Sequence, residues 1–272
     1  DATLIRSGAQ VLGEPAAGYL SHQGYAALPK APYRYQEMLG VIWRENPSCY
    51  VEDGEQAVLM AALMETDNAG RPLIDAWIKR SGLSADAWLE KLFEATVIPF
   101  YHLLCRYGVA LIAHGQNVTL VMKDYVPQRI LLKDFQGDMR LVDEDFPQAQ
   151  SLPEQVKAVT ARLSADYIIH DLQTGNFVTV LRFISRLTLQ SGVSETRFYQ
   201  ILAGVLRGYM AAHPDLAERF AKFDLFKPQI IRVILNPVKL TFSEHDGGSR
   251  MLPNYVTDLD NPLFLASRES AQ

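Results

Sequence analysis

The stretch 109-VALIAHGQNVTLVMKDYVPQRILLKDFQGDMRLVD-143 decides the fold of this chain, because three apolar runs in it alternate with polar loops. The first run covers residues 109–113, the second residues 118–122 and the third residues 129–133. Runs of roughly five residues rich in Val, Ile and Leu, bounded by Gly, Asn and Asp, are typical of strands. We therefore expect a small antiparallel sheet, with polar residues gathered where its strands end.

Helical spacing of apolar residues dominates the remainder of the chain. It predicts helices over residues 33–47, 54–65, 72–80, 153–164, 174–190, 194–212 and 214–224. A longer helix is expected to begin after Ser84 and to end at Gly108, with Pro99 kinking or splitting it. Residues 66–72 are expected to form a turn, and residues 229–242 a strand, a turn and a second strand. The expected fold class is α+β, mostly helical, with one small antiparallel sheet.

Composition excludes several classes of protein. The 272 residues are 48% hydrophobic and 21% charged, as in an ordinary globular protein. A net charge of -5 gives no general attraction to nucleic acid or to an anionic membrane. No apolar run reaches the roughly 18 residues that span a bilayer. Cys49 and Cys105 form no CxxC pair, so we expect neither a cysteine zinc site nor a disulfide framework, and a reducing, cytoplasmic compartment.

The polar residues between the strands have the chemistry of a nucleotide site. Gly115 allows close approach of a ligand to the backbone, and the amide oxygen of Asn117 suits a cation. Asp134 ends the neighbouring strand with a carboxylate, and Mg²⁺ prefers such oxygens together with phosphate and water. Kinase active sites bind the magnesium of ATP with the same two kinds of side chain, an asparagine and an aspartate. We expect Asn117 and Asp134 to bind Mg²⁺, and His114 and Gln116 to face the reacting end of a nucleotide.

A plainer interpretation of the same residues remains open. The HGQN segment, residues 114–117, is also typical of a hairpin turn, with Asp134 beginning the next turn. His170 and Asp171 are either an acid–base pair or, as we favour, the start of the helix over residues 174–190 with Asp171 as its cap. Three basic residues near the C-terminal strands are candidates for binding a carboxylate substrate: Arg232, Lys239 and Arg250.

The segments AHGQN at 113–117 and LKDF at 132–135 resemble the signature of the aerobactin-type (IucA/IucC) siderophore synthetases, which work without a non-ribosomal peptide assembly line. The resemblance extends over most of residues 33–263. It includes 39-LGVIWRENP-47, 137-GDMRLVDEDFP-147, 167-YIIHDLQTGNFVTVLRFIS-185, 223-FDLFKPQIIRVILNPVKL-240 and 260-DNPL-263. Within the family, the KDFQGD and HDLQTGNF segments look most like the alcaligin type, whose members join succinylated hydroxamate diamines.

This resemblance implies an ATP- and Mg²⁺-dependent ligase. Such an enzyme adenylates a carboxylate, here a succinyl-hydroxamate, and condenses it with an amine to an amide, releasing AMP and pyrophosphate. The nucleotide would contact His114, Gln116, Asn117, Lys133 and Asp134. The implied fold is the kinase-like palm of a hand-shaped enzyme over residues 33–272, with residues 1–32 an extended tail of a fingers domain. The chain would be an incomplete part of a full-length protein expected to form a homodimer.

The chain departs from the family pattern in several places. Ile112 stands where members often carry Glu, so one carboxylate is replaced. The Ser/Thr-Arg phosphate-binding segment of the fingers is not in this sequence. The C-terminal portion of such proteins is also likened to ferric-siderophore reductases, whose iron–sulfur cluster needs more cysteines than Cys49 and Cys105.

Two rival functions follow from the same residues. A small-molecule phosphotransferase would need an aspartate shortly after the histidine, and positions 115–119 have none. A non-catalytic siderophore-binding module would instead gather aromatic and basic side chains away from residues 114–134.

Overall fold

The computed structural model describes residues 1–19, 40–134, 138–234 and 254–269. The chain divides into two compact units. The first comprises Asp1–Val11, Pro47–Ile230 and Asp260–Gln272, and the second Leu12–Asn46 and Ile231–Leu259. The boundary predicted between residues 32 and 33 lies outside the described residues, so the division into a fingers tail and a palm remains a prediction.

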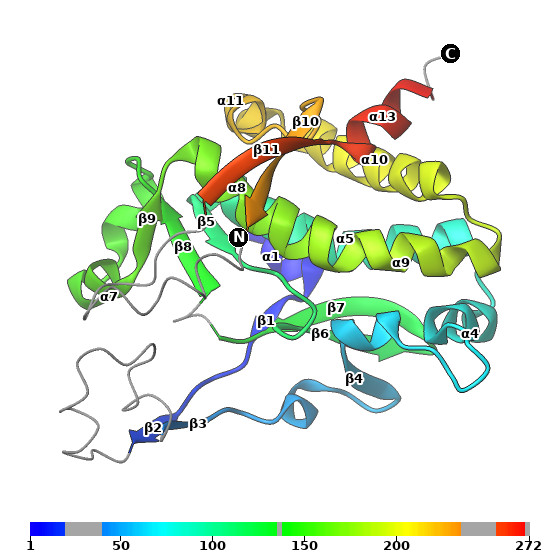
Figure 1. The fold of residues 1–272 in the computed structure, drawn as a ribbon. Coiled ribbons are helices and arrows are strands. Elements are labelled where there is room, and N and C mark those ends of the chain that lie inside the picture. Colours follow the sequence, from blue (N-terminus) through cyan, green and yellow to red (C-terminus); the bar gives the residue numbers. More distant parts are fainter. Residues whose placement is uncertain (20–39, 135–137, 235–253, 270–272) are drawn as a thin grey trace. The chain divides into compact units, whose positions relative to one another are not determined.

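The main sheet of the first unit has four strands in the order β1-β7-β6-β4 (Figure 1). These are β1 (Gln10–Val11), β7 (Val126–Leu132), β6 (Val118–Lys123) and β4 (Glu55–Leu59). β1 runs parallel to β7, and the other pairs are antiparallel. Val118 pairs with Leu132, so the start of β6 and the end of β7 lie at the same end of the sheet, as the sequence predicted.

A second sheet holds β5 (Val109–Leu111), β8 (Met139–Val142) and β9 (Ala161–Leu163) in the order β5-β8-β9. β5 and β6 therefore belong to different sheets, and residues 112–117 cross from one to the other. The hairpin interpretation of the HGQN segment is wrong, because its flanking strands do not pair with each other. The α+β class is confirmed, although the strands are distributed over more than the one sheet expected.

Helices pack in layers on the main sheet within the first unit (Figure 1). α5 (Ala85–His102) packs on β7, α10 (Glu195–Ala212) on α5, and α13 (Pro262–Glu269) on α10. Ser84 caps α5 as predicted, since its Oγ accepts a hydrogen bond from the backbone N of Ala87 at 3.2 Å. The helix continues through Pro99, so the predicted split is wrong. Burial of neighbours such as Phe100 offsets the roughly 3 kcal/mol that proline costs.

A π-helix, η3 (Leu103–Tyr107), follows α5 and ends at Gly108, whose φ of 65° is left-handed, as the predicted C-terminus requires. Other predicted helices are observed in whole or in part. They are α4 (Leu73–Ser81), η5 (Gln173–Leu181), α9 (Arg182–Leu187), η6 (Thr188–Ser191), α10, η7 (Pro214–Leu216) and α11 (Ala217–Lys222). Short 3₁₀ helices lie at η1 (Pro47–Tyr50) and η4 (Pro147–Ser151). Nowhere in the described chain is a helix long and apolar enough to cross a membrane.

Four secondary-structure predictions need correction. Residues 54–65 are β4 followed by the 3₁₀ helix η2 (Met60–Met64), and residues 153–164 are α7 (Glu154–Val159) followed by β9. Residues 40–43, predicted as helix, form β3, and residues 2–7, predicted as extended, form α1. Cross-strand partners explain β4 and β9, because β6 and β8 complete their backbone hydrogen bonds and override local propensity.

The second unit contains β2 (Ala16–Tyr19) antiparallel to β3 (Gly40–Trp43). β10 (Gln229–Ile234) pairs with β11 (Asn254–Asp260). β10 confirms the first strand predicted over residues 229–242, and the turn and second strand predicted there lie outside the described residues.

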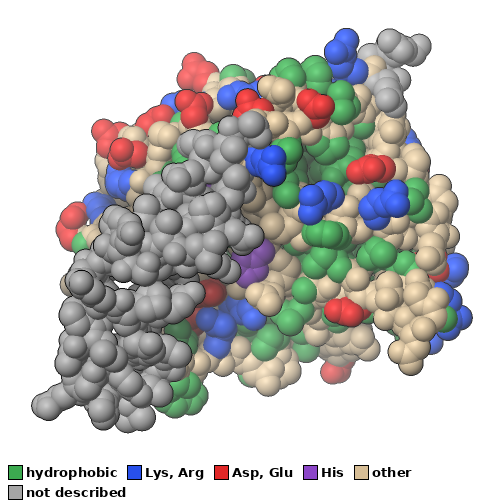
Figure 2. Space-filling view, in the orientation of Figure 1, with side chains coloured by type: hydrophobic (Ala, Val, Ile, Leu, Met, Phe, Trp, Pro, Cys, Tyr) green, Lys and Arg blue, Asp and Glu red, His purple; other side chains and the backbone are tan. Residues whose placement is uncertain are grey.

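On the face shown in Figure 2, acidic and basic side chains of the described residues are interspersed.

Candidate active site

Residues 112–117 are held from two sides by backbone contacts. The backbone N of Ala61, in η2, donates to the backbone oxygen of Gly115 at 3.0 Å. A Cβ on Gly115 would lie 3.1 Å from both Cα and N of Ala61. On another side, Nδ2 of Asn176 donates to the backbone oxygen of Ala113 at 3.0 Å. Glycine at 115 is thus required by close packing of the chain against itself, whereas the sequence had suggested close approach of a ligand.

Asp138 supplies a carboxylate that contacts side chains of this loop. Asn117 donates through Nδ2 to Oδ2 of Asp138, and Nε2 of His114 lies 3.3 Å from the same oxygen. The backbone N of Gln116 donates to Nδ1 of His114 at 3.3 Å. The imidazole of His114 and the amide of Asn117 therefore both lie against the same carboxylate oxygen of Asp138.

Asp134 contributes the turn that brings Asp138 to the loop. Its φ of 65° is left-handed, and its backbone oxygen accepts from the backbone N of Asp138 at 3.2 Å. Lys133, half-buried, follows β7 at the same end of the sheet as Asn117. The sequence predicted that Asn117 and a carboxylate after β7 converge. The carboxylate that contacts Asn117 is Asp138, four residues beyond the predicted Asp134, and the second acid of DFQGD was the signal for it.

The position of Asp138 also corrects the argument against a phosphotransferase. That argument relied on the lack of an aspartate at positions 115–119, yet an aspartate distant in sequence contacts His114. The absence of an acid next to the histidine in the sequence therefore does not discriminate between the two reactions.

His170 and Asp171 lie inside α8 (Ala165–Leu172), which continues directly into η5. Asp171 as a helix cap is therefore wrong, because this helix begins after Ser164. Burial raises the pKa of Asp171 to about 7, with Arg140 opposing the rise and Asp138 adding to it. His170 donates through Nδ1 to the backbone oxygen of Tyr167 at 2.5 Å, and burial lowers the pKa of the His170 imidazole.

Two of the other predicted site residues are exposed. Gln116 lies next to His114 in the loop, and Arg232 lies on β10 in the second unit. Lys239 and Arg250 lie outside the described residues, so their convergence with Arg232 stays a prediction. Among the residues that the structure describes, no group of three or more His, Cys, Asp or Glu side chains is placed to hold a metal ion.

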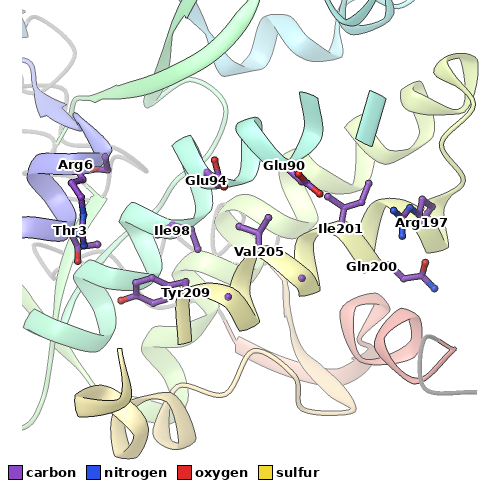
Figure 3. A pocket seen from close by; sticks show the side chains of 13 residues that line it. Thr3, Arg6, Glu90, Glu94, Ile98, Arg197, Gln200, Ile201, Val205 and Tyr209 are labelled. Carbon is purple, nitrogen blue, oxygen red and sulfur yellow. The ribbon is translucent and has the colours of Figure 1, made fainter. Parts of the chain in front are cut away.

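A separate groove of about 620 Å³ lies between α1 (Ala2–Ser7), α5 and α10 (Figure 3). Glu90 and Glu94 line it from α5, and Arg197 and Gln200 from α10. Arg197 is already paired with Asp86 at 2.7 Å. None of the predicted site residues lines this groove, so it is distinct from the candidate site.

We expect Gly115→Val to lower both stability and activity of the full-length protein. The new side chain would meet the backbone of Ala61, and the resulting shift of the loop would cost about 1–3 kcal/mol of unfolding free energy. Urea denaturation measures this loss of unfolding free energy. Gly204→Ala in α10 is the matched control, because nothing lies within 4 Å of its added Cβ, and it should stabilise the helix slightly. Equal stability of Gly115→Val and the parent would contradict the packing role.

Comparison with known proteins gives two family matches. The model described as IucA / IucC family matches residues 1–65, and the model described as Ferric iron reductase FhuF-like transporter matches residues 86–249. The aerobactin synthase of Escherichia coli is 68% identical over 269 residues, which are 99% of this chain and 46% of that protein.

Solved structures agree with the sequence matches. The aerobactin synthetase IucC from a hypervirulent pathotype of Klebsiella pneumoniae has a TM-score of 0.85 and 63% identity, over 98% of this chain and 45% of that one. The ATP-bound aerobactin synthetase IucA from the same source has a TM-score of 0.70 over 96% of this chain and 45% of that one; at 18% identity it shows the fold alone.

The chain spans slightly less than half the length of these relatives. They are named as aerobactin synthases and synthetases, and the expected likeness to the alcaligin type stays a prediction. The predicted family is confirmed, since both the family model and relatives of high identity agree with the motifs in the loop. The chain belongs to the IucA/IucC family, and its residues 86–249 also match the FhuF-like family.

Proposed function

We propose that the full-length protein is an ATP-dependent siderophore synthetase, and that this chain carries its nucleotide-facing loop. The observation that carries the proposal is the group His114, Asn117 and Asp138, set where β6 begins and β7 ends. The 68% identity with an aerobactin synthase over nearly the whole chain supports it.

The proposed reaction has two steps. A carboxylate oxygen of the acid attacks the α-phosphorus of ATP, and the bond to pyrophosphate breaks. The amine nitrogen then attacks the acyl carbon, AMP leaves with the former acyl–oxygen bond electrons, and the nitrogen loses a proton to give the amide. Negative charge grows on phosphate oxygens in both steps, so positioned donors and cations lower the barrier. His114, Gln116 and Lys133 are proposed for that role.

The residues present fit a magnesium ion. Asn117 uses its amide nitrogen on Asp138, which leaves the amide oxygen as the group that can bind a cation. That oxygen and the carboxylates of Asp134 and Asp138 are the hard ligands that Mg²⁺ prefers. Bound there, the ion would offset the negative charge of the triphosphate.

We further propose that Asp138 supplies the carboxylate for which other family members use Glu at position 112. Ile112 packs against the helix instead: its Cγ2 lies 3.1 Å from where a Cβ on Gly175 would be. Asp138 is joined to the same residue by its backbone oxygen, which accepts from the N of Ile112 at 3.0 Å.

The substrates and the assembly also belong to the proposal. The acid is a small carboxylate, for which the motifs suggest a succinyl-hydroxamate and the names of the relatives suggest a precursor of aerobactin. The partner substrate is an amine. A homodimer of the full-length protein remains a prediction, as does function in the cytoplasm.

The products separate this proposal from the phosphotransferase alternative. With acid and amine present, the full-length protein is expected to release AMP and pyrophosphate, because a carboxylate is already ionised at pH 7 and needs no base to attack. Hydroxylamine should trap the activated acyl group as a hydroxamate. Stoichiometric ADP with no trapped hydroxamate would reject the synthetase in favour of a kinase.

A further inference from the structure

The helix η5 contacts the 112–117 loop through a buried amide, that of Asn176. This residue is 0% exposed, and its Nδ2 donates to the backbone oxygen of Ala113 at 3.0 Å. Ala113 is also buried and is the residue before His114. The same Nδ2 lies 3.9 Å from the sulfur of Met60 in η2. The amide of Asn176 therefore lies where η5, η2 and the loop meet.

The contact fixes the peptide unit that leads into His114. The oxygen of Ala113 and the N of His114 belong to one planar unit, so a hydrogen bond to that oxygen also sets the direction in which the chain enters His114. The N of His114 donates to the backbone oxygen of Ile112 at 2.9 Å. Both polar atoms of the unit are thus engaged, and the ring that follows has its Nε2 3.3 Å from Oδ2 of Asp138.

The backbone of η5 approaches the loop closely beside Asn176. A Cβ on Gly175 would lie 3.1 Å from Cγ2 of Ile112 and 3.3 Å from the N of Ala113. η5 is a π-helix, a form that frequently occurs at functional sites. The absence of a side chain at position 175 therefore lets the amide at position 176 reach the backbone of the loop.

Stability does not account for this asparagine. Within the described residues, Oδ1 of Asn176 is buried and accepts no hydrogen bond. The loss from burying an unpaired polar atom is as large as the gain from one hydrogen bond, or larger, so the two ends of the amide offset each other.

Asn261, which is 1% exposed, is the contrasting case. Its Nδ2 donates to the backbone oxygens of Leu225 and Lys227, at 2.8 and 2.7 Å. Its Oδ1 accepts from the N of Leu263 at 3.1 Å. Both ends of that amide stabilise the fold, whereas the single hydrogen bond of Asn176 is directed at the loop of the candidate site.

We propose that Asn176 is a positioning residue, which holds the carbonyl of Ala113 and thereby keeps the imidazole of His114 beside Asp138. This inference rests on the proposed function, in which His114 is a donor to the phosphates of ATP. Without the amide donor, the peptide before His114 can turn, and the ring loses its fixed place.

The test replaces Asn176 in the full-length protein. Asn176→Leu keeps the branched shape and removes the donor. Acid-dependent exchange of pyrophosphate into ATP should fall by about 10- to 100-fold, mainly in kcat, because misplacing a reacting group by about 1 Å can cost roughly 10²-fold. The melting temperature should change little, since the unpaired Oδ1 is removed together with the hydrogen bond. Asn176→Asp keeps the size but sets a second oxygen against that of Ala113, and it should lower kcat at least as much.

Asn261→Leu is the matched control, because it removes the hydrogen bonds of an asparagine that only supports the fold. It should lower the melting temperature and leave kcat of the folded protein unchanged. Normal kcat in either folded variant of Asn176, whatever its melting temperature, would show a merely structural contact and overturn the proposal.

A readout without turnover keeps this inference separate from the proposed function. The ¹⁵N resonances of the His114 ring report its contact with Asp138 even if no exchange is detected in the parent protein. They should change in Asn176→Leu and remain as in the parent in Asn261→Leu. Unchanged resonances in folded Asn176→Leu would contradict the positioning role, whatever reaction the protein catalyses.

Discussion

Replacing Asp138 with alanine in the full-length protein is expected to reduce acid-dependent ATP–pyrophosphate exchange by about 10²- to 10³-fold, the range for removing one preorganised electrostatic contact from a reaction site. Asp138 is the shared partner of His114 and Asn117, so its loss releases both side chains at once. Its side chain is 14% exposed and makes no part of the apolar core, so the melting temperature should change little. Radiolabelled pyrophosphate exchange and differential scanning calorimetry measure the two effects.

Three further variants test this expectation more specifically. Asp143→Ala is the control, because Asp143 follows the same strand but its side chain is 68% exposed. Asp138→Asn keeps the shape and removes the charge, and it should lose nearly as much activity as Asp138→Ala if the carboxylate faces a cation. Asp134→Ala tests the metal ligand predicted from sequence, and excess Mg²⁺ should partly restore it. Full exchange by Asp138→Ala would contradict the proposed site.

Replacing Arg129 with methionine is expected to destabilise the protein by about 1–3 kcal/mol, because the hydrogen bonds of a part-buried ion pair are lost. Arg129 on β7 donates to both oxygens of Glu55 on β4, at 2.5 and 2.8 Å, across the intervening strand β6. It also donates to the backbone oxygen of Tyr50 at 2.7 Å. The side chain of Glu55 is 6% exposed. After Arg129→Met its carboxylate loses both hydrogen bonds from the guanidinium and keeps the one from the backbone N of Glu52 at 2.8 Å. Guanidinium denaturation at pH 7 measures the loss.

The pH dependence of this pair has a definite sign. The hydrogen bonds from Arg129 lower the pKa of Glu55 to about 2 from its ordinary 4.5. The stabilisation is therefore fully present above pH 4.5 and is lost as the pH falls toward 2. The difference in stability between the parent and Arg129→Met should shrink over the same interval. A difference that stays constant from pH 7 to pH 2.5 would exclude the ion pair as its cause.

The matched control is Arg71→Met. Arg71 pairs with Asp67 at 2.7 Å, but its side chain is 75% exposed, and exposed pairs contribute little to stability. It should therefore unfold at the same denaturant concentration as the parent protein. The double variant Glu55→Gln/Arg129→Met should recover part of the loss, because the buried charge is removed with its partner.

Local signals in the sequence determined much of the secondary structure of this protein and were enough to identify its family. The apolar runs at 118–122 and 129–133 predicted β6 and β7, and Ser84 and Gly108 predicted where a long helical segment begins and ends. These predictions succeed because apolar strand runs, helix capping and a left-handed glycine depend on neighbours within a few residues. The motifs around His114 were likewise sufficient to identify the family, since a loop of fixed residues carries its chemistry in its own sequence.

Tertiary structure alone decided the partners of those elements. β4 is a strand because β6 lies beside it, although its residues have the spacing of a helix. The carboxylate that accepts from Asn117 is that of Asp138, a contact between segments 21 residues apart that only the folded chain creates. The pKa of Asp171 is raised by burial because α8 packs against β5 and β8. Pairing, burial and electrostatic environment arise between segments distant in the chain, and a local pattern holds no information about them.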